Sequence, residues 1–220
     1  MCVKDDRQVL IVTAVEAERE AVLRGIGAAG ARFTVLAGGV GPAAAAASTA
    51  AALARGSYDL VVSAGIAGGF PGQAEVGSLV LASSIIAADL GAETEVGFMS
   101  VDELGFGSCV MEPHMPIVQK LSVAGQQAGY RVKVGAIITV TTVTGSAATA
   151  SLLAERVPGA AAEAMEGFGA ATAAQQLGIP FLEMRAISNE VGPRNREAWR
   201  IGDALRMLEN AASLLPEVLL

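Results

Sequence analysis

The segment from residue 160 to residue 199 constrains the fold most, because it contains two apolar stretches that each lead into a polar side chain. The first stretch, Ala160 to Met165, predicts a buried strand and is followed by Glu166. The second, Ile179 to Ile187, predicts another buried strand, with Asn189 just beyond it. In an open α/β sheet, ligands bind at the carboxyl ends of the strands. Glu166 and Asn189 are therefore predicted to share one site.

A helix is predicted between these two strands, beginning near Glu166 and ending at Gly178. A carboxylate at a helix N-terminus is favoured in its ionised form by the helix dipole. Glu166 could simply be such a helix-terminal acid. The apolar lead-in Ala-Ala-Ala-Glu-Ala-Met favours instead a carboxylate at the end of a buried strand.

The composition predicts one α/β domain over residues 1–220, since 52% of the residues are hydrophobic, only 17% are charged and 26 are glycines. The net charge of -7 argues against a nucleic-acid partner, because no basic stripe is available to neutralise phosphates. Positive charge clusters only between Arg194 and Arg200.

Location and metal binding are predicted from what the sequence lacks. The start, MCVKDDRQ, has no apolar region typical of a secretory leader, and Cys2 and Cys109 form no CxxC pair, which indicates a reducing cytoplasm. The uncharged run that begins at residue 134 is broken by Thr, Gly and Ser, so it predicts a strand, a turn and a helix rather than a membrane span. His114 has no second histidine at ligand spacing, so neither a metal nor another cofactor is expected.

Three acids open the helix that follows the first predicted strand, Gln8 to Ala14. Acids at a helix N-terminus usually complement the dipole on a solvated face, and this explains at least two of Glu16, Glu18 and Glu20. One of them could still turn inward above the carboxyl end of the strand.

A glycine-rich turn raises a different possibility, a dinucleotide-binding enzyme. Gly39, Gly41 and Ala44 follow a predicted strand and open an alanine-rich helix. The acidic partner expected about 20 residues later would be Asp59, which precedes the next strand instead of ending it. The glycines are better explained by a tight turn whose amides approach a small ligand or an anion.

The middle of the chain is predicted as a strand from Asp59 to Gly65 that ends in a second glycine-rich turn, and a strand from Ser78 to Asp89. Ser83 and Ser84 indicate a bend in this second strand or a position at the edge of the sheet. No periodic pattern is recognisable between residues 90 and 115. A loop of this length is usually functional, so Phe98 and Phe106 are predicted to form a lid or a subunit interface. A closing amphipathic helix is predicted after Trp199, with an apolar face made by Ile201, Leu205, Leu208 and Leu215.

The order of the motifs resembles one superfamily. AVEAERE after the first strand, GGVGP after the second, SAGIAGG at the third, AMEG after a later one and RAISN at the last are similar to the purine nucleoside phosphorylases and nucleosidases. The resemblance implies a central mixed β-sheet flanked by helices, a small-molecule nucleoside substrate and a homo-oligomer. Within that superfamily, DLGAETEVGF, SVDELGFG and ISNEVGPRNREAWRIGDAL resemble the futalosine hydrolases, which release hypoxanthine from futalosine in menaquinone biosynthesis.

The resemblance implies three catalytic residues. Glu18 matches the acid that activates the attacking water, and Glu166 matches the acid that holds the ribose hydroxyls. Asn189 stands where adenine-specific nucleosidases carry an aspartate that protonates N7 of the leaving base. An amide does not titrate, but it offers a donor to O6 of a 6-oxopurine and an acceptor to a protonated N7. This favours hypoxanthine over adenine, with the N7 proton supplied by water.

The resemblance also implies the residues that bind the substrate. Met165 matches a residue against the sugar, Ala67 and Gly68 match the turn beside ribose and base, and Val143 matches an apolar residue along the base. A further hypothesis assigns Arg194 and Arg196 to the carboxylate of the substrate side chain, because guanidinium pairs well with carboxylate. Surface ion pairing is the alternative for both arginines.

Several other functions stay open on the sequence alone. A phosphorylase is disfavoured because GGVGP and SAGIAGG contain no arginine for an anion pocket. A methylthioadenosine or adenosylhomocysteine nucleosidase is disfavoured by Asn189. A dinucleotide-dependent oxidoreductase and a non-catalytic nucleoside-binding protein are the alternatives of other classes.

Overall fold

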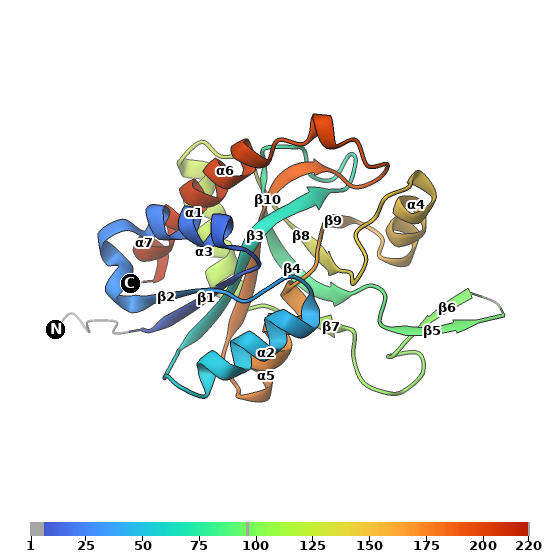
Figure 1. Ribbon diagram of the computed structural model, residues 1–220, viewed down its shortest axis with the longest axis horizontal. Coiled ribbons are helices and arrows are strands. Elements are labelled where there is room, and N and C mark those ends of the chain that lie inside the picture. Colours follow the sequence, from blue (N-terminus) through green and yellow to red (C-terminus); the bar gives the residue numbers. More distant parts are fainter. Residues whose placement is uncertain (1–6, 96, 220) are drawn as a thin grey trace.

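A mixed β-sheet forms the centre of the molecule, with helices on both sides (Figure 1). The computed structural model describes residues 7–95 and 97–219, so Cys2 lies outside the described residues. The strands are β1 (Val9–Thr13), β2 (Phe33–Ala37), β3 (Leu60–Gly69), β4 (Leu79–Ala87), β5 (Gly91–Thr94), β6 (Gly97–Ser100), β7 (Val110–Met111), β8 (Val132–Thr139), β9 (Ala160–Ala164) and β10 (Phe181–Glu190). The helices are α1 (Glu16–Ile26), α2 (Pro42–Leu53), α3 (Met115–Gln127), α4 (Ala147–Arg156), α5 (Gly167–Gln176), α6 (Ile201–Ser213), α7 (Leu215–Leu219) and the 3-10 turns η1 (Gly27–Arg32) and η2 (Arg196–Ala198).

Five strands close into a ring. β10 pairs with both β4 and β3, and the circuit is completed through β8 and β9. β1 and β2 extend the sheet outward from β3 in parallel. Parallel and antiparallel pairs therefore occur in one sheet, which confirms the mixed sheet predicted from the motifs.

The sheet separates two groups of helices (Figure 1). α1, α3, α6 and α7 pack on one side, and α2 and α5 pack together on the other. Along β1, Val9 and Ile11 belong to the first core while Leu10 and Val12 belong to the second. This double burial explains why the strand is an uninterrupted apolar run, because side chains alternate between the faces of a sheet.

β3 and β10 are longer than predicted. β3 continues through the glycines to Gly69, where a turn was expected after Gly65, and β10 continues through Asn189 to Glu190. These extensions pair with each other, because Asn189 lies opposite Gly68. A Cβ on Gly69 would lie 2.3 Å from the carbonyl oxygen of Ala74, so the glycine is needed for close packing rather than for a turn.

The segment between residues 90 and 115 contains structure that the sequence did not predict. β5 and β6 form an antiparallel hairpin that projects from the body, and β7 pairs with β4 (Figure 1). Strands of four and two residues are too short for an alternating pattern to be recognised.

Of the bend or edge predicted in the strand from Ser78 to Asp89, the structure shows an irregularity, as a register shift between Ala82 and Ser84 where β4 pairs with β8. The predicted closing helix is divided into α6 and α7, and its expected apolar face was wrong at Ile201, which is 42% exposed. In the described ranges, no helix is long and apolar enough to cross a membrane.

Candidate active site

A cavity of about 370 Å³ lies where α1, β3, β9 and β10 meet. Backbone and side chains from distant parts of the chain form its wall, including Val40, Thr144, Glu163, Ser188 and Trp199. The residues predicted from the sequence that line it are Glu18, Ala67, Gly68, Val143, Met165, Glu166 and Asn189. The structure therefore brings the predicted catalytic acids and the predicted base-side amide into one cavity.

Glu18 points inward from the first turn of α1 and is only 4% exposed. Its carboxylate accepts hydrogen bonds from the backbone N–H groups of Ala14 at 2.9 Å, Val15 at 3.3 Å and Ile66 at 2.8 Å. Burial raises the pKa of Glu18, and the nearby charge of Arg185 and the backbone donors oppose that rise. The carboxyl group is thereby fixed in position and made more basic than an exposed glutamate.

The neighbouring acids of α1 point away from the cavity. Glu16 pairs with Arg19 at the surface, and Glu20 is exposed. They fit the solvated dipole complement that was expected for at least two of the three acids.

Glu166 is the N-cap residue of α5, yet its side chain does not cap the helix. Its Oε1 accepts a hydrogen bond from the backbone N–H of Gly41 at 3.3 Å, and its Oε2 lies 3.2 Å from Nη1 of Arg185. The glycine turn predicted to approach an anion thus approaches a carboxylate of the protein itself. Gly41 has a φ of 93°, a conformation that favours glycine over other residues.

Sequence reasoning missed Arg185, a fully buried arginine on β10. Its Nε donates to Oε1 of Glu183 at 2.8 Å and its Nη2 donates to the hydroxyl of Ser63 at 2.9 Å. Burial alone would lower the pKa of Arg185, but the negative charges of Glu183, Glu166 and Glu18 raise it overall. Burial also raises the pKa of Glu183. The sequence did contain a signal for this pair. Glu183 and Arg185 are two residues apart in a strand predicted to be buried, so both side chains lie on the same face of the sheet.

Gly65 lies where Glu18 and Arg185 approach each other. A Cβ at this position would be 2.5 Å from Nη1 of Arg185 and 2.7 Å from Oε1 of Glu18. The second glycine-rich segment of the sequence therefore gives space for charged side chains beneath the cavity.

Asn189 is held by its own neighbours. Its Oδ1 accepts from the hydroxyl of Ser188 at 2.8 Å, and its Nδ2 donates to the carbonyl oxygen of Glu190 at 2.9 Å. Each interaction uses one of two available positions, so the amide keeps a donor and an acceptor for a ligand.

Arg194 and Arg196 do not line the cavity. Their guanidinium carbons lie 5.3 Å and 5.9 Å from the centre of the ring of Trp199, which does line it. Both arginines are exposed and stand just outside the cavity wall.

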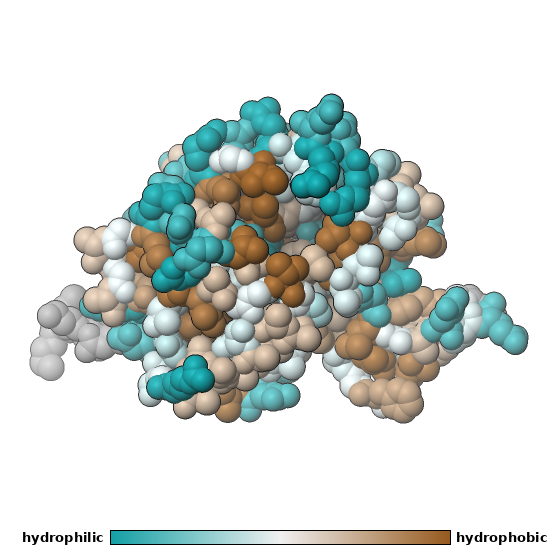
Figure 2. Space-filling view, viewed as in Figure 1, coloured by the Kyte–Doolittle hydropathy of each residue, from teal (hydrophilic) through white to brown (hydrophobic). Residues whose placement is uncertain are grey.

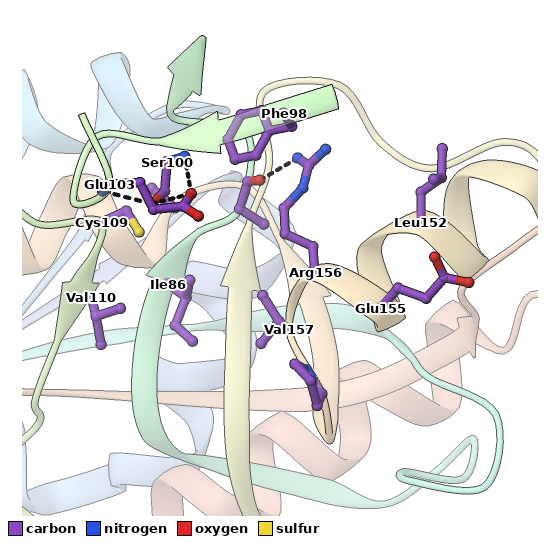
Figure 3. Close-up of a pocket in the computed structure, with 13 residues that line it drawn as sticks. Ile86, Phe98, Ser100, Glu103, Cys109, Val110, Leu152, Glu155, Arg156 and Val157 are labelled. Carbon is purple, nitrogen blue, oxygen red and sulfur yellow. Dashed lines mark hydrogen bonds between the residues drawn. The ribbon is translucent and has the colours of Figure 1, made fainter. Parts of the chain in front are cut away.

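A second cavity, of about 690 Å³, lies between the β5–β6 hairpin and α4 (Figure 3). Arg156 stacks on Phe98 at 3.6 Å and donates to the carbonyl oxygen of Ala88, so its charge is already engaged. Burial raises the pKa of the Cys109 thiol to about 11, which keeps it protonated and weakly nucleophilic near neutral pH. None of the residues predicted for catalysis lines this cavity.

Among the residues that the structure describes, no three His, Cys, Asp or Glu side chains are grouped to hold a metal ion. The arrangement around Glu18, Glu166 and Asn189 instead offers two carboxylates and an amide around a small cavity. It can deprotonate a water molecule, bind hydroxyl groups and hydrogen-bond the edge of a flat base.

A family model described as "Phosphorylase superfamily" matches residues 12–220. The chain belongs to the phosphorylase superfamily. This confirms the superfamily indicated by the order of the motifs. Within the superfamily, the chain is 52% identical to a futalosine hydrolase of Streptomyces coelicolor over 96% of this chain and 95% of that protein. It is 46% identical to a futalosine hydrolase of Acidothermus cellulolyticus, with 94% and 89% covered.

The fold is shared with solved superfamily structures. A 5'-methylthioadenosine/S-adenosylhomocysteine nucleosidase of Neisseria meningitidis, in complex with methylthio-immucillin-A, matches with a TM-score of 0.82. It is 20% identical, and the match covers 96% of this chain and 98% of the nucleosidase. At that identity the likeness supports the fold alone.

Proposed function

We propose that this protein hydrolyses the N-glycosidic bond of futalosine and releases hypoxanthine in menaquinone biosynthesis. The observation that carries the proposal is a cavity in which two buried carboxylates, Glu18 and Glu166, accompany an amide, Asn189. The relatives from Streptomyces coelicolor and Acidothermus cellulolyticus, both named futalosine hydrolase, support it because the similarity extends over nearly the whole chain.

Glu18 acts as the general base that takes a proton from the attacking water. Its pKa is raised by burial, which strengthens the carboxylate as a base while three backbone donors hold it in place. General base catalysis of this kind is typically worth about 10² to 10⁴ in rate.

Glu166 accepts hydrogen bonds from the ribose hydroxyls, with Met165 against the sugar. Departure of the base develops positive charge at the anomeric carbon, which a nearby carboxylate stabilises. Arg185 orients this carboxylate from beneath, because its Nη1 lies 3.2 Å from Oε2 of Glu166. Gly41 fixes the other oxygen through its N–H.

The base lies between Val143 and the floor formed by Ala67 and Gly68, with its edge toward Asn189. The Asn189 amide donates to O6 and accepts from a protonated N7, the proton coming from water. In a 6-aminopurine such as adenine, an amino group replaces O6, so the NH₂ of Asn189 would face another hydrogen-bond donor. Asn189 therefore favours hypoxanthine over adenine.

Arg194 and Arg196 receive the carboxylate of the futalosine side chain at the rim of the cavity. Their position beside Trp199, which lines the cavity, supports this assignment. Guanidinium groups pair with carboxylates through two parallel hydrogen bonds.

Hydrolysis is favoured over phosphorolysis by the charges around the cavity. In the described part of the chain, no arginine or lysine lines it, and the buried Arg185 beneath it is already paired with Glu183 and Glu166. The second candidate is a methylthioadenosine or adenosylhomocysteine nucleosidase, which would use the same fold. Asn189 disfavours this candidate.

The active protein is a cytoplasmic homo-oligomer that associates through the β5–β6 hairpin and the residues that flank it, from residue 90 to residue 110. Phe106 is 82% exposed, and Leu90 and Val110 are also exposed. Figure 2 shows apolar residues at the base of the projection on the right of the view and hydrophilic residues at its tip. Exposed apolar patches of this kind often mark interaction sites.

The proposal is tested by base release from purified protein in phosphate-free buffer. Futalosine, aminodeoxyfutalosine, methylthioadenosine and inosine are offered in parallel. Hypoxanthine from futalosine, with kcat/KM well above that for methylthioadenosine, is the expected result. Preferred release of adenine from methylthioadenosine would replace the proposal with the nucleosidase alternative, and turnover only with added phosphate would indicate a phosphorylase.

A further inference from the structure

Glu163 is a buried carboxylate in the cavity to which the proposed mechanism gives no role. It lies on β9, is 5% exposed and lines the cavity together with Thr144. Burying a carboxylate is costly unless hydrogen bonds compensate for the lost hydration. The partners of Glu163 therefore indicate what the residue does.

Both oxygens of Glu163 contact the same residue. Oε1 accepts from the backbone N–H of Thr144 at 2.9 Å, and Oε2 accepts from its hydroxyl at 2.5 Å. Thr144 is 5% exposed, whereas the preceding Val143 is 38% exposed and lines the cavity. The carboxylate thus holds the residue next to Val143 and fixes how that apolar side chain meets a ligand.

The turn that carries Val143 connects β8 to α4, and among the residues that the structure describes its other hydrogen bonds lie at its two ends. The N–H of Thr141 donates to Asp89 at 2.6 Å near its start. At the end of the turn, Ser146 caps the N-terminus of α4, because its hydroxyl accepts a hydrogen bond from the N–H of Thr149 at 3.1 Å. Glu163 supplies the contact between these two points, on the side of the turn that faces the cavity.

Strand register puts Glu163 on the base side of the cavity. Asn189 on β10 lies opposite Gly68 on β3, and Gly68 lies opposite Glu163 on β9. Residues in register across neighbouring strands share one face of a sheet. Two strand spacings separate the backbones of Asn189 and Glu163 by roughly 10 Å, with a glycine between them. A flat ring over Gly68 would have Asn189 on one side and the turn held by Glu163 on the other.

We infer that Glu163 is a positioning residue, which fixes the turn of Val143 and Thr144 as the base-side wall of the cavity. The inference rests on the proposed function, because it assumes that a purine base occupies this side. Glu163 acts through Thr144 and does not itself take part in the chemical step.

Glutamine is the conservative test of this role. Its carbonyl accepts from the N–H of Thr144 and its NH₂ donates to the Thr144 hydroxyl, so Glu163→Gln preserves both contacts without the charge. Glu163→Ala removes both contacts. Thr144→Ser keeps them, and Thr144→Val keeps only the backbone contact.

Kinetics on futalosine and thermal unfolding of each variant form the experiment. Glu163→Ala is expected to raise KM by about 10 to 100-fold with kcat changed much less, since hydrogen bonds to a charged group are lost. Glu163→Gln and Thr144→Ser are expected to keep KM within about threefold of the original, and Thr144→Val to fall between. Glu155→Ala, which removes an exposed carboxylate from α4, is the matched control and leaves KM unchanged.

Binding of hypoxanthine, followed by the fluorescence of Trp199, gives a readout that needs no turnover, since this is the sole tryptophan and it lines the cavity. An unchanged KM in Glu163→Ala, or an equal loss in Glu163→Gln, would overturn the inference while futalosine hydrolysis stands. If Glu163→Ala does not fold, an unchanged KM in Thr144→Val would overturn the inference instead. Hypoxanthine binding that weakens in Glu163→Ala, in a protein that does not hydrolyse futalosine, would support the inference and reject the proposed function.

Discussion

Nη1 of Arg185 lies 3.2 Å from Oε2 of Glu166, with both side chains almost completely removed from solvent. The same guanidinium also pairs with Glu183 at 2.8 Å. One buried cation thus serves two buried carboxylates, one of which faces the cavity. The orientation of Glu166 therefore depends on a residue that a substrate does not need to touch.

Replacing Arg185 with methionine is expected to damage stability and activity together. Two carboxylates would lose their counterion, which costs about 3–5 kcal/mol in the free energy of unfolding. Loss of orientation at Glu166 is expected to lower kcat/KM about 100-fold or more. Urea unfolding and base release measure the two effects. Arg131→Met, at an exposed ion pair with Glu75, is the control and is expected to change stability by at most about 1 kcal/mol. Full activity in Arg185→Met would show that Glu166 is oriented by other means.

Replacing Glu18 with glutamine removes the proposed base and keeps its shape. We expect kcat to fall by about 10² to 10⁴ while KM changes little, because the amide cannot accept a proton. Glu20→Gln, at an exposed position of the same helix, is expected to leave kcat unchanged. Retention of more than a third of kcat by Glu18→Gln would assign the base to another group.

The pH dependence of kcat/KM follows from the raised pKa of Glu18. The base works only when ionised, and burial raises its pKa above the ordinary value of 4.5. Activity is therefore expected to rise with pH through a midpoint above 4.5. The contribution of Glu18 to the free energy of unfolding has the opposite trend. Because its pKa is higher in the folded protein than in the unfolded chain, Glu18 stabilises the fold at low pH, and this stabilisation is lost as pH rises through the folded pKa. A midpoint at or below the ordinary value, measured in a pH series on futalosine, would contradict the assignment.

Replacing Asn189 with aspartate is expected to change the preferred base. A carboxylate has no N–H for O6 of hypoxanthine, so kcat/KM for futalosine should fall by about 10 to 100-fold. A protonated carboxyl can donate to N7 of adenine, so the ratio of methylthioadenosine to futalosine hydrolysis should rise. Asn189→Ala separates loss of the amide from gain of the acid, since it should lower both activities. An unchanged ratio in the aspartate variant would remove Asn189 from base selection.

Replacing Arg194 and Arg196 together with alanine tests recognition of the substrate carboxylate. We expect KM for futalosine to rise by about tenfold or more while kinetics on inosine, which lacks that carboxylate, stay unchanged. The comparison of two substrates in one variant controls for general disturbance near Trp199. Equal effects on both substrates, or none on futalosine, would return these arginines to a surface role.

The sequence predicted the strands that carry Glu166 and Asn189 because buried strands next to helices have apolar, β-branched or alanine-rich patterns. It also predicted that one acid of the first helix could turn inward, and Glu18 does. It did not predict that β3 would continue beyond Gly65 to Gly69, because glycines such as those at the end of β3 are typical of turns. Their continuation depends on pairing with β9 and β10, which are distant in sequence.

The charged group beneath the cavity was missed for a related reason. A single arginine in an apolar strand contributes little to a periodicity pattern, and its partners Ser63 and Glu166 come from other elements. Glu163 was overlooked because its partner, Thr144, lies 19 residues away across a helix. Positions that depend on contacts between elements require the assembled fold.

Closure of β3, β4, β8, β9 and β10 into a ring also protects the protein against unwanted association. A strand with an unpaired edge can recruit another chain and begin aggregation. In the described part of this sheet, the open edges are β2 and the two-residue β7, while β3, β9 and β10, which form the cavity, have neighbours on both sides. The strands that form the cavity are thus unavailable for growth of a larger sheet, so the cavity can stay open to a ligand without exposing an unpaired strand edge.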